Sequence, residues 1–248
     1  MSAARTHGTA TALGPARAAD PARYVIGGAM PRAALRPVTR EEVTEVLRAA
    51  TREGLAVVPW GAGTALARAR APERYDLALD LTALDRIVEY EPEDMTLTAE
   101  CGVTLGALAA VLAARGQELP LEGARASQAT LGGALAVNAS GPRRLRFGAP
   151  RDRILGARYA LADGTLARTG GRVVKNVAGY ALHRLACGSR GGLTVILEAS
   201  LKLLPAPEAR VALVFGASAA EIADGARWAV FPRLEPAVLT VVRGVPVG

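Results

Sequence analysis

The chain has 248 residues, of which 50% are hydrophobic, enough for one large globular domain or two modest ones. Its formal net charge is +7 and is carried almost entirely by arginine, because Lys175 and Lys202 are the only lysines. The arginines are spread along the sequence and only 4% of the residues are aromatic, so the composition does not indicate a nucleic-acid-binding protein. A basic surface also suits a diphosphate, an acidic protein partner or an anionic membrane face.

Cysteine and histidine are too scarce for a metal centre. Cys101 and Cys187 are the only cysteines, and His7 and His183 are the only histidines, so no zinc, haem or iron–sulfur spacing can be built from this chain. The apolar surroundings of both cysteines favour buried thiols over a disulfide. We therefore predict no metal ligands.

The N-terminal segment is rich in alanine, threonine, arginine and glycine, and we interpret residues 1–35 as a flexible tail. It lacks the apolar core of a signal peptide, so a secretory signal is not expected. No apolar run approaches the roughly 18 residues of a membrane span. The longest apolar helical candidate, 105–114, ends at Arg115. We expect a cytoplasmic chain without a membrane span, which reaches the inner membrane only through partner subunits.

The first predicted helix begins at a capping box, because Thr39 precedes Glu42 by three residues. Gly54 is a natural C-terminal residue for this helix, and the apolar strand 55–58 follows it. A glycine-rich loop, Pro59–Thr64, therefore starts where a strand ends. Its glycines can adopt positive φ and bring bare N–H groups against an anion.

That loop has a rival interpretation as the dinucleotide fingerprint G-x-G-x-x-G. Leu66 occupies the third glycine position, and no clean helix opens after the loop, so the fingerprint fails. On its own, the segment would be an ordinary glycine-rich turn.

A second candidate phosphate cradle lies further along the chain. Strands are predicted over 77–81, 86–90 and 96–101, followed by a helix that starts at Thr104 and ends at Gly116. Beyond them, Thr130 sits at an N-cap position, with Gly132 and Gly133 in the first helical turn, where unpaired amides and the helix dipole attract phosphate. Two such cradles suggest a pyrophosphate ligand.

The rest of the sequence predicts antiparallel structure. Asp163-Gly164 separates strands 154–162 and 165–168 and is a strong hairpin signal. The remaining predicted elements are a strand, a short helix and a strand, over 173–177, 181–186 and 193–203. Hairpins together with helices favour an α+β fold over an all-parallel sheet.

The order of these motifs resembles the FAD-binding domain shared by vanillyl-alcohol oxidase and UDP-N-acetylenolpyruvoylglucosamine reductase relatives, the PCMH-type domain. The resemblance covers residues 36–205 and implies an α+β domain of two α/β subdomains. The matching segments are P-x-G-x-G-T at 59–64, A-T-L-G-G at 129–133, N-A-S-G at 138–141, L-A-D-G at 161–164, K-N-V-A-G-Y at 175–180 and C-G-S at 187–189.

The resemblance implies roles for particular residues around FAD. The backbone amides of Gly61, Ala62, Gly63 and Thr64 would bind the pyrophosphate, and Thr130, Gly132 and Gly133 would lie on its opposite side. Asn138 and Gly141 would lie near the flavin or its ribityl chain. The backbone at Val195 and Ile196 would lie on the adenine side. For Asn138 a simple helix C-terminal turn remains the alternative. The FAD would be noncovalent, because the 59–66 loop contains no histidine or cysteine for the attachment usual in covalent members.

Two departures from the family pattern stand out. The usual G-T-L-G is replaced by Gly191-Gly192-Leu193-Thr194, which is expected to alter the adenine end of the pocket. The family's C-terminal cap domain is represented only by residues 206–248, about half of a ferredoxin-like fold with elements at 211–215, 218–230 and 237–243.

The Lys175–Tyr180 segment looks most like the FAD-binding subunit of bacterial glycolate oxidase. That resemblance implies oxidation of a small 2-hydroxy acid together with a homologous flavoprotein subunit and an iron–sulfur subunit. The alternatives are a self-sufficient D-lactate or 2-hydroxy-acid dehydrogenase and a non-catalytic assembly subunit. No catalytic residue is identified: His183 reads as a structural histidine, and Arg143, Arg144 and Arg146 as a solvated basic loop.

Overall fold

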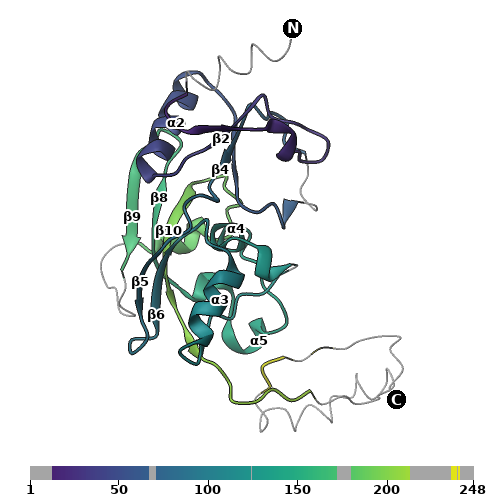
Figure 1. Cartoon of the computed structure of the whole chain (residues 1–248), viewed down its shortest axis with the longest axis vertical. Helices are drawn as coiled ribbons and strands as arrows, with labels where there is room; N and C mark the ends of the chain where they lie inside the picture. Colours follow the sequence, from purple (N-terminus) through teal and green to yellow (C-terminus); the bar gives the residue numbers. More distant parts are fainter. Residues whose placement is uncertain are drawn as a thin grey trace.

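Two separate β-sheets and the helices packed on them carry the fold in a computed structural model of the chain (Figure 1). The structure describes residues 13–66, 71–123, 125–171, 180–212, 236–238 and 240. One sheet has four strands, another has five, and a third consists of two short strands.

The four-stranded sheet has the order β1-β2-β4-β3. Its strands are Arg17–Ala19, Ala33–Arg36, Leu77–Asp80 and Val57–Trp60 in that order. Strands β2 and β3 both run parallel to β4, while β1 is antiparallel to β2. A short 3₁₀ turn, η1, occupies Pro21–Arg23.

The expected tail over 1–35 is wrong for its described part. Residues 17–19 and 33–36 are strands of this sheet, and Leu13 is only 1% exposed in its core. The strands were missed because they are short and built of alanine and arginine, which carry little β-propensity.

Helix α2, Arg40–Arg52, covers this sheet and begins at the capping box. The Thr39 hydroxyl accepts a hydrogen bond from the Glu42 N–H at 3.1 Å, and the Glu42 carboxylate accepts one from the Val38 N–H at 2.7 Å. Gly54 follows at φ +61°, as the sequence predicts.

The five-stranded sheet is antiparallel throughout, in the order β5-β6-β10-β8-β9. Its strands are Ile87–Glu91, Thr96–Glu100, Val195–Lys202, Ile154–Ala160 and Leu166–Gly170 in that order. The β8–β9 hairpin closes around Asp163-Gly164, with a hydrogen bond from the Leu161 N–H to the Thr165 carbonyl at 2.9 Å. The α+β fold class is therefore confirmed.

Helices α3 and α4 pack on one face of the five-stranded sheet (Figure 1). The helices of this half are α3 Leu105–Ala113, α4 Leu131–Val137, α5 Arg144–Phe147 and α6 Leu182–Ala186, with 3₁₀ turns η3 Ala126–Gln128 and η4 Pro150–Asp152. Strand β7, Gln117–Glu118, pairs with β11, Leu204–Pro205.

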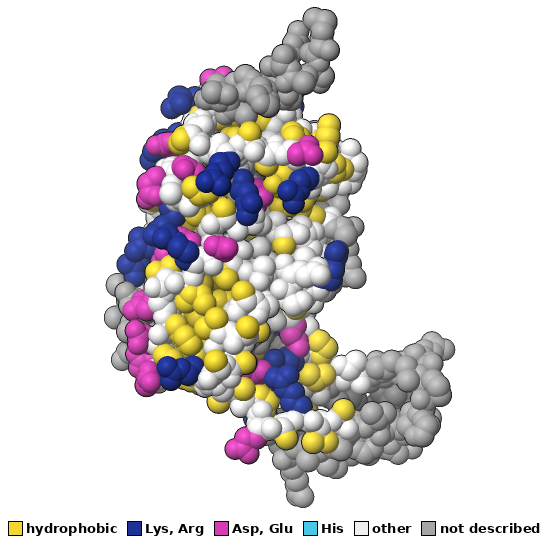
Figure 2. All heavy atoms as spheres, viewed as in Figure 1, with side chains coloured by type: hydrophobic (Ala, Val, Ile, Leu, Met, Phe, Trp, Pro, Cys, Tyr) yellow, Lys and Arg dark blue, Asp and Glu magenta, His cyan; other side chains and the backbone are white. Residues whose placement is uncertain are grey.

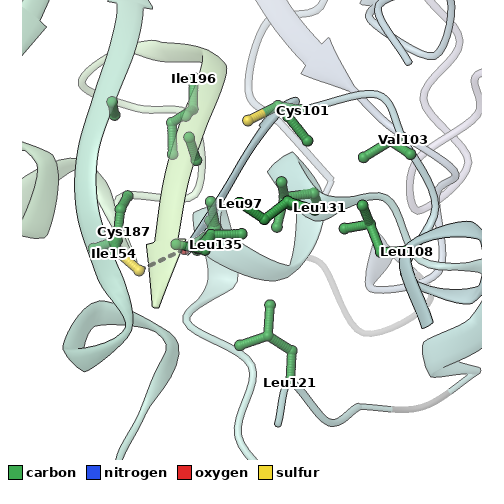
Figure 3. Close-up of a cluster of buried hydrophobic side chains, with 14 of the residues drawn as sticks. Leu97, Cys101, Val103, Leu108, Leu121, Leu131, Leu135, Ile154, Cys187 and Ile196 are labelled. Carbon is green, nitrogen blue, oxygen red and sulfur yellow. Dashed lines mark hydrogen bonds between the residues drawn. The ribbon is translucent and has the colours of Figure 1, made fainter. Parts of the chain in front are cut away.

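Large apolar side chains from α3, α4 and the sheet meet in one core cluster (Figure 3). Leu108 and Leu131 are at most 1% exposed, and Leu97 of strand β6 lies beside Leu131 in this cluster. Burial of each such leucine contributes about 1.5 to 3 kcal/mol. This core fixes the position of α4, whose two ends matter for the site.

Polar and charged side chains cover the opposite face of the five-stranded sheet. Glu198 on β10 is 8% exposed and pairs with Arg40 Nη1 at 3.2 Å and Arg158 Nε at 3.1 Å. Because Arg40 belongs to α2, this carboxylate ties the helix of the first sheet to the second sheet. Figure 2 shows basic side chains interleaved with acidic ones on the visible face, so that face has no continuous basic patch.

Several sequence-based expectations fall outside the described residues. These are the strand at 173–177 and most of the cap expected over 206–248, while residues 206–212 have no regular structure. Within the described part of the chain, no helix could cross a membrane, and no group of acidic, cysteine and histidine side chains is placed to hold a metal ion.

We predict that Glu198→Gln lowers the free energy of unfolding by roughly 1 to 3 kcal/mol, because it weakens two hydrogen bonds to charged partners. Denaturant unfolding measures the change. Glu91→Gln, at an exposed position of β5, is the matched control and should stay within about 0.5 kcal/mol of wild type. Equal losses in the two variants would contradict the role of the Glu198 cluster.

Candidate functional site

The first glycine-rich loop follows β3 and forms a turn whose backbone N–H groups have no acceptor within the described residues. Gly63 has φ +72°, in the left-handed region that glycine tolerates best. Among the described residues, no acceptor is found for the N–H groups of Gly61, Ala62, Gly63 and Thr64. Successive free N–H groups in such a turn form a concave site for an anion.

The second motif packs directly against this loop. A Cβ added at Gly61 would lie 2.2 Å from the Thr130 hydroxyl oxygen, closer than any non-bonded contact allows. Only glycine at position 61 permits this approach. The two motifs that the sequence separates thus meet in space, as the pyrophosphate hypothesis requires.

The amides at the start of α4 are not free, which corrects one expectation. Gly132 N–H donates to the Cys101 carbonyl at 2.7 Å, and Leu131 N–H donates to the Val103 carbonyl at 2.8 Å. Gly133 N–H donates to the Thr130 hydroxyl at 3.2 Å, so Thr130 is the predicted N-cap. The first turn of α4 therefore forms a wall of the cradle, and the unpaired donors come from the Gly61–Thr64 loop.

Gly132 has a packing role. A Cβ at this position would lie 2.9 Å from the Cys101 Cβ, so glycine lets α4 pack closely against the segment after β6. Burial raises the pKa of the Cys101 thiol, which therefore stays protonated and apolar in character.

The C-terminal end of α4 holds a third segment in place. Asn138 caps the helix in the left-handed region at φ +51°, and its side-chain oxygen accepts from the Arg151 N–H at 3.2 Å. Gly188 N–H donates to the Leu135 carbonyl at 3.0 Å, and the Cys187 thiol donates to the same carbonyl at 3.2 Å, drawn dashed in Figure 3. The alternative interpretation of Asn138, a helix C-terminal turn, is therefore confirmed. This end of α4 also holds residues 187–192 in place through the hydrogen bonds to the Leu135 carbonyl.

This third segment also contacts the first loop. Gly191 has φ +79°, and a Cβ there would lie 3.3 Å from Pro59 Cγ. Residues 59–64, the two ends of α4 and the turn at 187–194 thus converge. The conformation of each segment depends on a close approach or a left-handed backbone at glycine or asparagine.

Two hydroxyl groups on the 187–194 turn have no hydrogen-bond partner. They are Ser189 Oγ and Thr194 Oγ1, which are the only buried side-chain nitrogen or oxygen atoms without a partner among the described residues. An unsatisfied buried hydroxyl points to a partner from outside the chain, such as a ligand or an ordered water. Together with the free amides of the first loop, they make this region fit a polar, phosphate-bearing ligand.

The remaining candidate residues lie at the edges of this region. Gly141 packs on Glu122, whose carboxylate accepts from the Arg143 N–H at 3.0 Å. Val195 and Ile196 are 6% and 5% exposed, with side chains in two different core clusters. Any contact of these two residues with a ligand therefore has to come from the backbone, as the resemblance implies.

Aromatic support under the first loop was not predicted from the sequence. A Cβ at Gly63 would lie 3.2 Å from the Trp60 ring, which meets the Tyr24 ring edge-on at 5.2 Å between centroids. The Tyr24 hydroxyl donates to the buried Asp80 at 2.6 Å. Burial and this hydrogen bond raise the pKa of Tyr24, so it remains a neutral donor. Tyr24 lay in the expected tail, and no local pattern connects it with Trp60.

His183 is a buried histidine, as expected for a structural role. It is 6% exposed, and its Nδ1 lies 3.4 Å from the Thr169 hydroxyl. Burial, with Arg184 nearby, lowers its pKa and favours the neutral ring. Arg143 pairs with Glu118 and stacks over the Phe147 ring at 4.9 Å, so it is not part of a freely solvated basic loop.

Comparison with known proteins gives relatives that share this part of the chain. The chain is 34% identical over 185 residues to the glycolate oxidase subunit GlcD of Bacillus subtilis (strain 168), covering 75% of this chain and 39% of that protein. It is 43% identical over 136 residues to the glycolate oxidase subunit GlcE of Escherichia coli (strain K12), covering 54% and 39%. It also matches the D-lactate dehydrogenase of Anaerostipes hadrus, at 30% identity over 190 residues, covering 77% and 40%. The chain thus spans about two-fifths of the length of these relatives.

Solved structures show the same fold. An alkyldihydroxyacetonephosphate synthase superposes with a TM-score of 0.62 at 24% identity, over 74% of this chain and 34% of that one. At this identity the likeness concerns the fold alone.

A family model described as an FAD binding domain matches residues 31–170. The matched segment contains the free-amide loop, Thr130 with the start of α4, and Asn138 at its end. Because more than half of the chain matches this model and both glycine-rich motifs lie within it, the chain belongs to the family of FAD-binding domains and has FAD as its cofactor.

Proposed function

We propose that this chain carries noncovalent FAD within a glycolate oxidase-like complex that oxidises a small 2-hydroxy acid. The observation that carries the proposal is the contact of the free-amide loop at Gly61–Thr64 with Thr130, which brings two distant glycine-rich motifs together. Relatives named as glycolate oxidase subunits and D-lactate dehydrogenase support the class of substrate.

In this proposal the chain's own residues bind and orient the cofactor. The loop amides hold the pyrophosphate through Gly61, Ala62, Gly63 and Thr64, with Thr130, Gly132 and Gly133 as the facing wall. Asn138 and Gly141 lie toward the flavin or ribityl chain, and the backbone at Val195 and Ile196 lies toward the adenine. Bound FAD supplies the acceptor for the two electrons that leave the hydroxy acid.

The proposed partners are a homologous flavoprotein subunit and an iron–sulfur subunit that takes the electrons onward. The word subunit in the names of two relatives supports an assembly, and the resemblance in the Lys175–Tyr180 segment supports this particular one. The second candidate is a self-sufficient 2-hydroxy-acid dehydrogenase, favoured by the relatives named D-lactate dehydrogenase and D-2-hydroxyglutarate dehydrogenase.

We expect Gly63→Ala to weaken FAD binding strongly, while Gly54→Ala leaves it unchanged. Both glycines have similar backbone angles, φ +72° and +61°, so both variants lose roughly 1 to 2 kcal/mol of stability to backbone strain. Only Gly63 belongs to the cradle; a Cβ at Gly54 meets no atom within 4 Å. Equilibrium dialysis with FAD, beside thermal unfolding, tests the pair. Wild-type affinity in Gly63→Ala would mean that the pyrophosphate lies elsewhere.

Purified protein should release its yellow colour on acid precipitation, because the 59–66 loop has no histidine or cysteine for a covalent bond. Absorbance of the supernatant and of the redissolved pellet measures the two fractions. Flavin that stays with the pellet would contradict noncovalent binding. A colourless protein that FAD cannot reconstitute would overturn the proposed function.

The FAD-loaded chain alone should show little oxidation of glycolate or D-lactate in a dye-linked assay, since the proposal assigns turnover to the assembled complex. Addition of the partner subunits should restore activity. Turnover by the isolated chain at about 1 per second or faster, an ordinary enzyme rate, would favour the self-sufficient dehydrogenase instead.

A further inference from the structure

An apolar groove opens beside α3, on the side of this helix that faces β7 and η3. It encloses a cavity of about 440 Å³. None of its lining residues belongs to the 59–64 loop, to α4 or to the 187–194 turn, so the groove is separate from the cofactor cradle. Its apolar lining consists of Leu105, Leu108, Ala109, Ala113, Leu119 and Leu121.

Backbone contacts fix both walls of this groove. A Cβ at Gly106 would lie 2.7 Å from the Ser127 carbonyl oxygen, so glycine lets η3 pack directly on α3. On the other side, the Ala206 N–H donates to the Gly116 carbonyl at 2.8 Å and holds the segment after β11 in place. The groove is therefore formed in the chain alone, which lowers the cost of filling it.

The apolar surface continues from the groove over the outside of α3. Residues 104–114 contain no charged side chain. The exposed positions of the helix are all alanine or valine, namely Ala107, Ala109, Ala110, Val111 and Ala113. In α2 the exposed positions are all polar, namely Glu41, Glu45, Arg48, Thr51 and Arg52. A helix that is apolar on every side is normally covered.

The rim of the groove is basic. Arg143 and Arg210 both pair with the Glu118 carboxylate, so two guanidinium groups share one carboxylate. The Arg210 side chain is 69% exposed and has N–H donors left for a second acceptor. This rim suits an incoming carboxylate. A second copy of this chain would bring the same two arginines against it, and like charges across an interface are unfavourable.

We propose that the groove is the docking site of a partner subunit, which inserts an apolar helix with carboxylate side chains at one end. The apolar side chains of that helix fill the groove and cover α3, while its carboxylates meet Arg143 and Arg210. Binding of an amphipathic helix in an apolar groove is a common mode of recognition. The inference rests on the proposed function, because the partner belongs to the proposed complex.

Cysteine labelling tests whether the partner covers the groove. Cys101 and Cys187 are buried, so the wild-type chain gives little background with a maleimide. Ala109→Cys places a thiol at the exposed edge of the groove, and its labelling rate should fall about tenfold or more when the two partner subunits are added. Glu45→Cys, on the exposed side of α2, is the matched control and should label at one rate with and without the partners.

Two substitutions test the apolar surface and the basic rim separately. Ala109→Glu and Arg210→Glu should each raise the Kd of the complex about tenfold or more, measured by fluorescence anisotropy. Arg210→Lys keeps the charge and should retain most of the affinity. All three variants should keep the wild-type Kd for FAD and a melting temperature within about 2 °C of wild type.

Wild-type affinity for the partners in Ala109→Glu would overturn the inference and leave the proposed function standing. Labelling of Ala109→Cys that is unchanged in the complex, or already slow in the isolated chain, would also overturn it. Self-association of the wild-type chain that Ala109→Glu abolishes would assign the groove to a second copy instead. Failure of the wild-type, FAD-loaded chain to bind either partner subunit is a separate result, which refutes the proposed complex and this inference with it.

Discussion

The contact between Gly61 and Thr130 is the constraint on which the cradle depends. With no space for even one methyl group, the loop after β3 lies directly against Thr130, the residue before α4. Thr130 at once caps α4 and limits the approach of the loop. The free amides of the loop are therefore presented against a fixed wall, which is the preorganisation that anion binding requires.

Local patterns in the sequence predict the elements that depend on local interactions. The capping box at Thr39, the N-caps at Thr104 and Thr130 and the hairpin at Asp163-Gly164 are all confirmed, because each is decided by side chains within a few residues. Convergence of the two glycine-rich motifs was also predicted, because both sequence patterns are typical of phosphate-binding turns, and the Gly61–Thr130 contact confirms that they meet.

The sequence-based expectations that were wrong share one physical cause: the interacting partners lie far apart along the chain. The amides of Leu131 and Gly132 were expected to be free, but the carbonyls of Val103 and Cys101 take them. Strand β1 was missed because its three residues gain their structure only by pairing with β2. The Tyr24–Trp60–Asp80 support under the loop joins three segments that no sequence period connects. In each case the deciding atoms lie far away along the chain.

The central place of β10 bears on how the domain is made in the cell. This strand is among the last of the described elements to leave the ribosome, yet it lies between β6 and β8 in the five-stranded sheet. Until it emerges, those two strands expose unpaired edges, which are prone to association with other chains. The strands of the first sheet all lie before residue 81, although its core is completed by Ala160, Val195 and Leu197 of the second sheet. The second sheet therefore closes only after β10 has been made, and the facing edges of β6 and β8 stay unpaired until then.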